Sequence, residues 1–508
     1  KKKYKKAEDA ARNWQYEKAY SILEKALEEQ SDYAKALFLY GQLKMEKEEF
    51  EHAQELLIKG LSICPMYSKE MYWLIASMAF EVGNYDRAAQ YFESYLRFFG
   101  LNEEKIKLAQ ERWDEAHFLK QMYSTPVPYN PKPVPGISTK YDEYLPIISA
   151  DNEIAFFTRR RIKKEVGMLR AETVEEFIIS NLDEGIFNFG DLMPHPFNFH
   201  KNEGGASLTI DNNELFLTIC EATNGYKNCD IFYTNRKDSL WTPLRRLLYP
   251  VNKSDSWESQ PTISSDGNML LFSSIRPGGK GGADIYSVTR TENGYWGNLQ
   301  SLSINTEGDE ESPFLHPDNQ TLYFSSNGHR GLGGMDIFFV KKDSSGNWGD
   351  PQNIGHPINS QEDDFGLFVS TDGKTAYFAS NKLDGKGGWD IYHFPLYKEA
   401  RPERVLFLKG DVLDEFGNPL IESSVQIVSM KNNNFFEIDV DIETGRYVAA
   451  IALEKDEDVM VTVNDDFYAF NSQYVSATDE AFRSPGKLDF DMKEMKEGEA
   501  FLIKNIYF

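Results

Sequence analysis

Two cysteines of this sequence are placed so that they could form a disulfide bond. Cys220 and Cys229 have eight residues between them, and the repeats described below place them on either side of one hairpin loop. Facing positions on adjacent strands bring Cβ atoms near the distance that a disulfide requires. The pair is therefore a candidate disulfide, with two free thiols as the alternative. The bond would indicate an oxidising compartment.

No arrangement typical of a metal site, a nucleotide site or a catalytic site is recognisable. The eight histidines form no His-Glu-x-x-His pair, and three cysteines are too few for a four-cysteine zinc site. The Gly-rich segments 278–282 and 385–388 do not follow the phosphate-binding pattern and connect strand to strand, which favours hairpin turns. The neighbouring Asp363 and Asp364 would point to opposite faces of a strand, so they make no acid/base pair. We expect no catalytic residue, no metal, no cofactor and no enzymatic activity.

One basic cluster stands out in an acidic chain. Lys and Arg total 55 against 80 Asp and Glu, a formal net charge of −25, so we expect no nucleic-acid binding, because phosphate would be repelled. Residues 159–164 read Arg-Arg-Arg-Ile-Lys-Lys. The segment is either a solvated loop or a docking patch for an acidic partner or a lipid headgroup. The candidate partner-contact residues are Arg159, Arg160, Arg161, Lys163 and Lys164.

The first 123 residues contain a repeat whose period is about 34 residues. An aromatic residue is followed three positions later by alanine, and then by a large apolar residue. The three copies are Tyr16, Ala19, Leu23; Phe50, Ala53, Leu57; and Tyr85, Ala88, Phe92. This pattern is typical of the tetratricopeptide repeat (TPR), and 103–122 is predicted to be a final capping helix. A concave surface for a partner protein is the functional interpretation, and a rigid spacer is the alternative.

A second repeat follows a Pro-rich stretch, 126–135, and occurs in five copies. Each copy opens with an apolar residue and Asn or Ser, passes through a turn containing Asp, and continues with an apolar strand and a further loop. Four copies then contain Asp-Ile-aromatic, at Asp230, Asp284, Asp336 and Asp390, which are 54, 52 and 54 residues apart. Four short strands in about 50 residues predict one blade of a β-propeller.

The order of these copies predicts how the ring closes over 124–403. The last copy lacks a Trp-type fourth strand, whereas the segment 134–137 precedes the first complete copy. We expect the residues around this segment, near 130–138, to supply the missing outer strand, because closure removes both exposed sheet edges. Five blades are predicted, with six as the alternative.

A third pattern begins near Leu408. A turn at 414–420 is followed by alternating Val425 and Ile427, and a second turn at 444–447 by alternating Val459, Val461 and Val463. The order G-x-V-x-D-x-x-G-x-P-L resembles the carboxypeptidase regulatory-like domain, which implies a non-catalytic, prealbumin-like β-sandwich over 404–497. The last residues, 498–508, resemble the opening strand of a truncated OmpA-like domain.

The order of these modules resembles the OmpA-family periplasmic lipoproteins of the type IX secretion and gliding apparatus (PorE-like). The resemblance implies a multidomain α + β protein in the periplasm, tethered to the outer membrane by an N-terminal lipid and to peptidoglycan by a C-terminal domain. Neither the lipid-bearing cysteine nor most of that domain is in this sequence.

The function expected from this resemblance is a non-enzymatic scaffold. It would link peptidoglycan to protein components of an outer-membrane secretion or gliding complex. One alternative is an envelope protein that binds glycans through aromatic residues at the propeller mouth. A propeller-associated hydrolase is the other.

Overall fold

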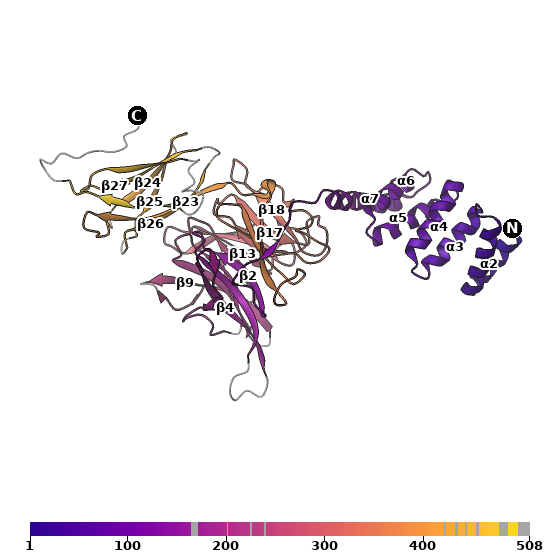
Figure 1. Cartoon of the computed structure of the whole chain (residues 1–508), viewed down its shortest axis with the longest axis horizontal. Helices are drawn as coiled ribbons and strands as arrows, with labels where there is room; N and C mark the ends of the chain where they lie inside the picture. Colours follow the sequence, from indigo (N-terminus) through magenta and orange to yellow (C-terminus); the bar gives the residue numbers. More distant parts are fainter. Residues whose placement is uncertain are drawn as a thin grey trace. The chain divides into compact units, whose positions relative to one another are not determined.

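The computed structural model describes residues 1–163, 171–200, 202–223, 226–237, 240–420, 423–431, 435–441, 444–453, 457–476 and 486–495. The chain divides into two compact units, Lys1–Pro126 and Val127–Phe508, and Figure 1 shows helices in the first and strands in the second. The expected opening strand of an OmpA-like domain, 498–508, lies outside the described residues. None of the helices in the described ranges is both long enough and apolar enough to cross a membrane.

The first unit, called here the helical unit, consists of helices that pack in chain order. They are α1 (Lys2–Arg12), α2 (Tyr16–Glu29), α3 (Ala34–Met45), α4 (Phe50–Ile63), α5 (Lys69–Glu81), α6 (Tyr85–Leu96) and α7 (Glu103–Ser124). The repeated alanines Ala19, Ala53 and Ala88 are completely buried in α2, α4 and α6. Gly41 is needed where α3 meets α4, because a Cβ there would lie 2.6 Å from Leu57. The predicted helical hairpins are confirmed, and their core clusters contain residues of this unit alone.

The second unit, called here the β unit, begins with five antiparallel sheets in which consecutive strands are neighbours. Sheet 1 contains β2 (Asp142–Ile148), β3 (Ile154–Lys163), β4 (Glu172–Asp183), β5 (Ile186–Phe187) and β6 (Asp191–Leu192). Sheet 2 contains β7 (Glu203–Leu208), β8 (Glu214–Thr223), β9 (Tyr226–Lys237), β10 (Leu240–Trp241) and β11 (Arg245–Arg246). Sheet 3 contains β12 (Glu258–Ile263), β13 (Met269–Ser274), β14 (Asp284–Arg290) and β15 (Trp296–Ser301).

Sheets 4 and 5 complete the series. Sheet 4 contains β16 (Glu310–Leu315), β17 (Thr321–Ser326), β18 (Asp336–Lys341) and β19 (Gln352–Asn353). Sheet 5 contains β20 (Phe368–Val369), β21 (Thr375–Ser380), β22 (Asp390–Pro395) and, as its outer strand, β1 (Lys132–Pro133). Lys132 pairs with His393 and Pro133 with Tyr392. The incoming segment therefore pairs with the last sheet, within the residues near 130–138 expected from the sequence.

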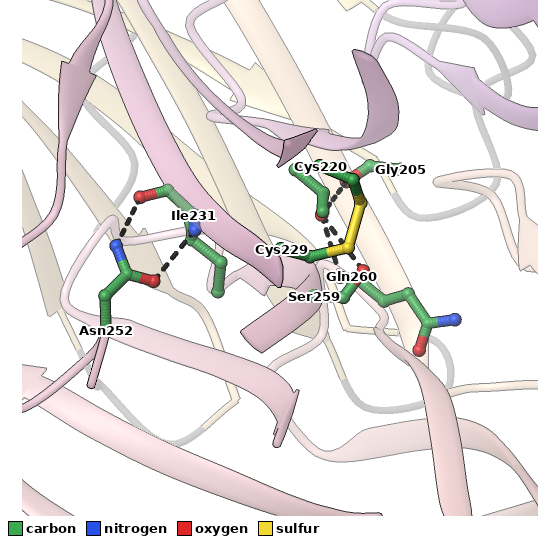
Figure 2. The surroundings of a disulfide bond; sticks show 8 residues. Gly205, Cys220, Cys229, Ile231, Asn252, Ser259 and Gln260 are labelled. Carbon is green, nitrogen blue, oxygen red and sulfur yellow. Dashed lines mark hydrogen bonds between the residues drawn. A yellow bond between two sulfur atoms is a disulfide. The ribbon is translucent and has the colours of Figure 1, made fainter. Parts of the chain in front are cut away.

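Neighbouring sheets are joined by side chains that we call the latch residues: Ser138, Asn198, Asn252, Asn305 and Asn359. Each reaches back to the third strand of the preceding sheet. The amide of Asn252 accepts from the Ile231 N–H and donates to its carbonyl oxygen, both at 2.8 Å, as Figure 2 shows. Asn198, Asn305 and Asn359 repeat this pair with Phe177, Ile285 and Ile337.

The remaining latch residue joins the first sheet to the last. Ser138 donates its hydroxyl to the carbonyl oxygen of Ile391 on β22, at 3.3 Å. Nearby, the N–H of Val134 donates to the same carbonyl, at 2.9 Å. Strand β2 of sheet 1 also contacts β20, β21 and β22. The interactions that link each sheet to the next therefore also link the fifth to the first.

The rest of the β unit is a two-sheet sandwich. One sheet contains β26 (Arg446–Leu453), β23 (Arg404–Asp414), β29 (Gly486–Lys487) and β30 (Phe490–Met492). The other contains β25 (Phe435–Asp439), β24 (Ser424–Ser429), β27 (Val459–Asn464) and β28 (Asn471–Val475). The alternating Val459, Val461 and Val463 are buried between the sheets, as their spacing predicts.

Candidate functional site

Carboxylates occupy equivalent positions at the start of the sheets. Glu143, Glu203, Glu258 and Glu310 are buried, and Asp364 is partly exposed. Glu310 accepts from the Thr306 N–H at 2.7 Å and from the hydroxyls of Thr306 and Ser326 at 2.6 and 2.7 Å. Glu203 accepts from the backbone N–H groups of 198–200. Each carboxylate thus holds the turn that precedes its sheet, and these contacts account for its burial.

A second set of carboxylates begins the third strand of sheets 3, 4 and 5. Asp284, Asp336 and Asp390 each accept through Oδ2 from two N–H groups of the Gly-rich loop before the strand. The loops contain glycine because a Cβ at Gly279, Gly331 or Gly385 would lie within 2.0 Å of this oxygen. The loops are therefore hairpin connections held by local hydrogen bonds, as the sequence predicts.

The other oxygen, Oδ1, of the same three aspartates is buried and has no hydrogen-bond partner among the described residues. Burial raises the pKa of Asp336 to about 6, and the nearby Asp364 carboxylate adds to this increase. Burial also raises the pKa of Asp284, near which Glu310 lies. Within the described ranges, no group of three or more His, Cys, Asp or Glu side chains could hold a metal ion.

We expect the Asp336→Asn variant to be more stable than the original chain at pH 8, with a smaller difference at pH 4. Because the pKa of folded Asp336 is raised from 3.8 to about 6, its proton stabilises the fold at low pH. That stabilisation is lost as the pH rises from about 4 to 6, a change of up to about 3 kcal/mol. Urea unfolding between pH 4 and 8 measures the difference.

The control for this prediction is the Asp343→Asn variant. Asp343 is exposed, and hydrogen bonds from the Asn347 and Ser345 N–H groups lower its pKa. Replacing Asp343 should therefore not make the variant increasingly more stable than the original chain between pH 4 and 6. If the free energies of unfolding of the original chain and of the Asp336→Asn variant change with pH in the same way, the pKa of Asp336 is not raised in the folded state.

The basic cluster is largely paired with acidic residues of sheet 1. Arg159, expected as a partner contact, is 3% exposed, and its Nε donates to Glu143 Oε1 at 2.8 Å. Its guanidinium also lies 4.2 Å from the Phe189 ring centroid. The partner-contact expectation for Arg159 is therefore wrong, because its charge is neutralised inside the sheet. An acidic residue on a neighbouring strand cannot be recognised as the partner of an arginine from the sequence until the strand register is known.

The remaining basic residues divide into two groups. Arg160 and Arg161 are partly exposed and form ion pairs with Asp142 and Glu176, both at 2.6 Å. Lys163 ends β3, and Lys164 lies outside the described residues. The described arginines of this cluster therefore offer little unpaired positive charge to an acidic partner.

Cys220 and Cys229 are joined by a disulfide bond. They face each other on β8 and β9, and their Cα atoms are 4.0 Å apart. Figure 2 shows the bond close to Ile231, which the latch residue Asn252 holds from the next sheet. The bond thus closes a hairpin of sheet 2 near a junction between two sheets.

A small cavity lies where the first strands of the five sheets meet. It is lined by residues 145–147, 205–207, 260–262, 312–314 and 366–368, and its volume is about 80 Å³. The leading residue of each segment has a positive φ: Leu145, Gly205, Gln260, Ser312 and Gly366. In the first four sheets the strand register shifts there, which marks a β-bulge. Ligand sites typically measure about 300–1,000 Å³, so this cavity is too small for a sugar ring.

Comparison with protein families identifies one repeat. Residues 10–63 match the family model described as Tetratricopeptide repeat. No curated protein matches the chain. The sequence-based prediction of TPR hairpins in the helical unit is therefore confirmed, whereas no comparison supports the OmpA-family or type IX secretion assignment.

Several solved structures resemble the chain at low similarity. One is described as a glycoside hydrolase, with 10% identity, a TM-score of 0.36, and coverage of 60% of this chain and 97% of that one. The α-L-arabinofuranosidase PaAbf62A from Podospora anserina has 10% identity, a TM-score of 0.34, and coverage of 53% and 95%. The α-L-arabinofuranosidase CtGH43 from Clostridium thermocellum has 12% identity, a TM-score of 0.30, and coverage of 49% and 88%.

These similarities correct one expectation from the sequence. The sequence predicts no enzymatic activity, whereas the similar structures are described as a glycoside hydrolase and as α-L-arabinofuranosidases. The absence of a recognisable catalytic motif therefore does not exclude activity. Because their TM-scores are 0.36 or lower, these structures assign neither an activity nor catalytic residues to this chain.

Proposed function

We propose that this chain is a scaffold that binds a protein partner through its helical unit. The observation that carries the proposal is the TPR match at residues 10–63 within a stack of paired helices. Such stacks present an extended surface on which a peptide or helix can lie. Binding by this unit does not depend on an activity elsewhere in the chain.

For the β unit we propose a closed, five-bladed propeller as the rigid body of the scaffold. Two observations support five blades: five sheets precede the sandwich, and each is joined to the preceding one by a latch residue. The pairing of β1 with β22 supports closure by the incoming segment. A closed ring leaves no long sheet edge for unwanted pairing.

We further propose that the scaffold works in the periplasm, between peptidoglycan and an outer-membrane secretion or gliding complex. The module order described under Sequence analysis motivates this placement. The disulfide between Cys220 and Cys229 supports an oxidising compartment. Attachment by an N-terminal lipid and a C-terminal wall-binding domain is part of the same proposal.

Deleting residues 1–126 should abolish partner binding while the β unit stays folded, because the two units have separate cores. Co-purification from envelope extracts, with the intact chain and with residues 127–508, measures the loss. The isolated fragment 1–126 should recover the same partner, and circular dichroism of both fragments checks that each is folded.

Equal recovery of the same envelope proteins by the intact chain and by residues 127–508 would contradict the role of the helical unit. Recovery of no envelope protein by the intact chain would contradict the scaffold itself. The alternative function, glycan binding, cannot use the central cavity of the five sheets, because its volume of about 80 Å³ is too small for a sugar ring. A glycan would have to bind elsewhere on the chain.

A further inference from the structure

The loop between β27 and β28, residues 465–470, exposes two phenylalanines. Phe467 and Phe470 are 67% and 49% exposed. Tyr468, between them, packs partly against the sandwich core. Complete burial of one such side chain would stabilise the fold by about 1.5–3 kcal/mol. Because Phe467 and Phe470 are both largely exposed, the fold gains only part of this stabilisation from each. Neighbouring exposed aromatic side chains are typical of a binding surface.

The same residues border a cavity of about 560 Å³ on the sandwich. Met495 and Val463 contribute apolar surface, and Ser424, Asn464, Asp465 and Asp466 contribute polar groups. The volume falls within the usual range for ligand sites, about 300–1,000 Å³. This cavity is therefore large enough for a sugar ring, unlike the cavity at the centre of the five sheets.

The loop is held in place before any ligand binds. Asp465 accepts from the Ser423 hydroxyl at 2.7 Å and from the Phe467 N–H at 2.9 Å. The Phe467 carbonyl accepts from the Met495 N–H at 2.8 Å, and the Ala469 N–H donates to the Lys493 carbonyl at 2.8 Å. These bonds fix the backbone on both sides of the aromatic rings. A preformed site loses less conformational entropy on binding.

The polar groups have capacity left for a ligand. Asp466 is exposed and forms no hydrogen bond or ion pair with the described part of the chain. Asn464 likewise has no side-chain partner within those ranges. A carboxylate accepts and an amide both donates and accepts. Aromatic faces beside such groups suit a molecule with apolar C–H faces and hydroxyl groups at its edges.

We propose that this cavity, bounded by Phe467, Phe470 and Asp466, binds a hydroxyl-rich glycan without acidic groups. The pyranose ring would stack on the phenylalanines, and its hydroxyls would bond to Asp466 and Asn464. Asp465, Asp466 and the net charge of −25 would repel uronic acids. The site is independent of the helical unit, so it adds to the protein-binding function and does not rest on it.

Calorimetric titration of the full chain with soluble oligosaccharides tests the proposal. The probes are cellohexaose, the hexamer of N-acetylglucosamine and a galacturonic acid hexamer. At least one of the two neutral hexamers should bind, and the acidic one should not. Phe467→Ala and Phe470→Ala should each weaken that binding at least about tenfold, as truncation of a central aromatic contact does.

The matched control is Phe435→Ala. Phe435 is 66% exposed on β25 of the same sandwich and does not line the cavity, so its loss should leave the binding constant unchanged. All three variants remove exposed side chains, and circular dichroism should show the same fold in each.

No binding of either neutral hexamer at millimolar concentration would overturn the proposal. Equal weakening by Phe435→Ala, or binding that Phe467→Ala and Phe470→Ala leave unchanged, would also overturn it. If the helical unit still captures its protein partner in that case, the glycan site fails while the scaffold function stands.

Discussion

Replacing Asn252 with alanine is expected to lower the free energy of unfolding of the β unit by about 2–6 kcal/mol. Asn252 is buried, and its amide bonds to both backbone groups of Ile231 and to the Leu247 carbonyl oxygen. Alanine would remove the partner of the Ile231 N–H and of the Leu247 carbonyl oxygen, whereas the Ile231 carbonyl oxygen would keep its bond from the Leu247 N–H, at 3.0 Å. Each such group costs about 1–3 kcal/mol.

Urea unfolding of the Asn252→Ala variant measures this loss, with Asn293→Ala as the control. Asn293 is exposed in the loop between β14 and β15, so its replacement should change the free energy of unfolding by about 0.5 kcal/mol or less. Similar small losses in both variants would show that the latch residues do not hold the sheets together.

Replacing Arg159 with alanine is expected to destabilise the β unit by about 3–5 kcal/mol. The change would leave the Glu143 carboxylate, which is completely buried, without its ion-pair partner. It would also remove the guanidinium contacts with the Ile137 and Phe189 carbonyl oxygens. Thermal and urea unfolding of the variant measure the effect.

Two further variants separate this explanation from a general loss of positive charge. Arg160→Ala should cost less than about 1 kcal/mol, because the Arg160–Asp142 pair is partly exposed. The double variant Arg159→Met, Glu143→Leu should regain part of the stability, since an apolar pair leaves no buried charge. The regain is only partial because the Thr139 N–H and hydroxyl lose the Glu143 carboxylate as their acceptor. A single Arg159→Ala variant as stable as Arg160→Ala would contradict the buried ion pair.

Several features of the fold were predictable because local sequence determines them. The alanines at 19, 53 and 88 revealed the helical hairpins, since close helix packing requires a small residue at each crossing. The Asp-Ile-aromatic repeat marked third strands, because a carboxylate there caps the preceding Gly-rich loop. The incoming strand was expected near residues 130–138, where β1 lies. The helical and loop patterns depend on neighbours along the chain, whereas the expected closure follows from the order of the repeats.

Most side-chain partners across strands or sheets could not be predicted, with the disulfide between Cys220 and Cys229 as an exception. Arg159 looked like an exposed charge, because its partner Glu143 lies on another strand. The repeated Asn after an apolar residue was visible, but its bond to the preceding sheet was not. The exposed aromatic loop at 465–470 was overlooked, although three aromatic residues within four positions beside two aspartates could have indicated it.

The pairing of β1 with β22 has a mechanical consequence. The chain enters the five sheets through β1 and leaves them after β22, and the two strands are antiparallel neighbours. Tension between the two ends of the chain would therefore pull on adjacent strand ends and break their hydrogen bonds one after another, as in a zipper. On the entry side, the first hydrogen bond in that path runs from the Val127 N–H to the His356 carbonyl oxygen, at 2.7 Å, and the last from the Val134 N–H to the Ile391 carbonyl oxygen, at 2.9 Å. On the exit side, the Tyr323 hydroxyl of sheet 4 donates to the Ala400 carbonyl oxygen, at 2.6 Å, so this bond would also have to break. Under load the ring would then open at sheet 5 while the strands of sheets 1 to 4 stay paired.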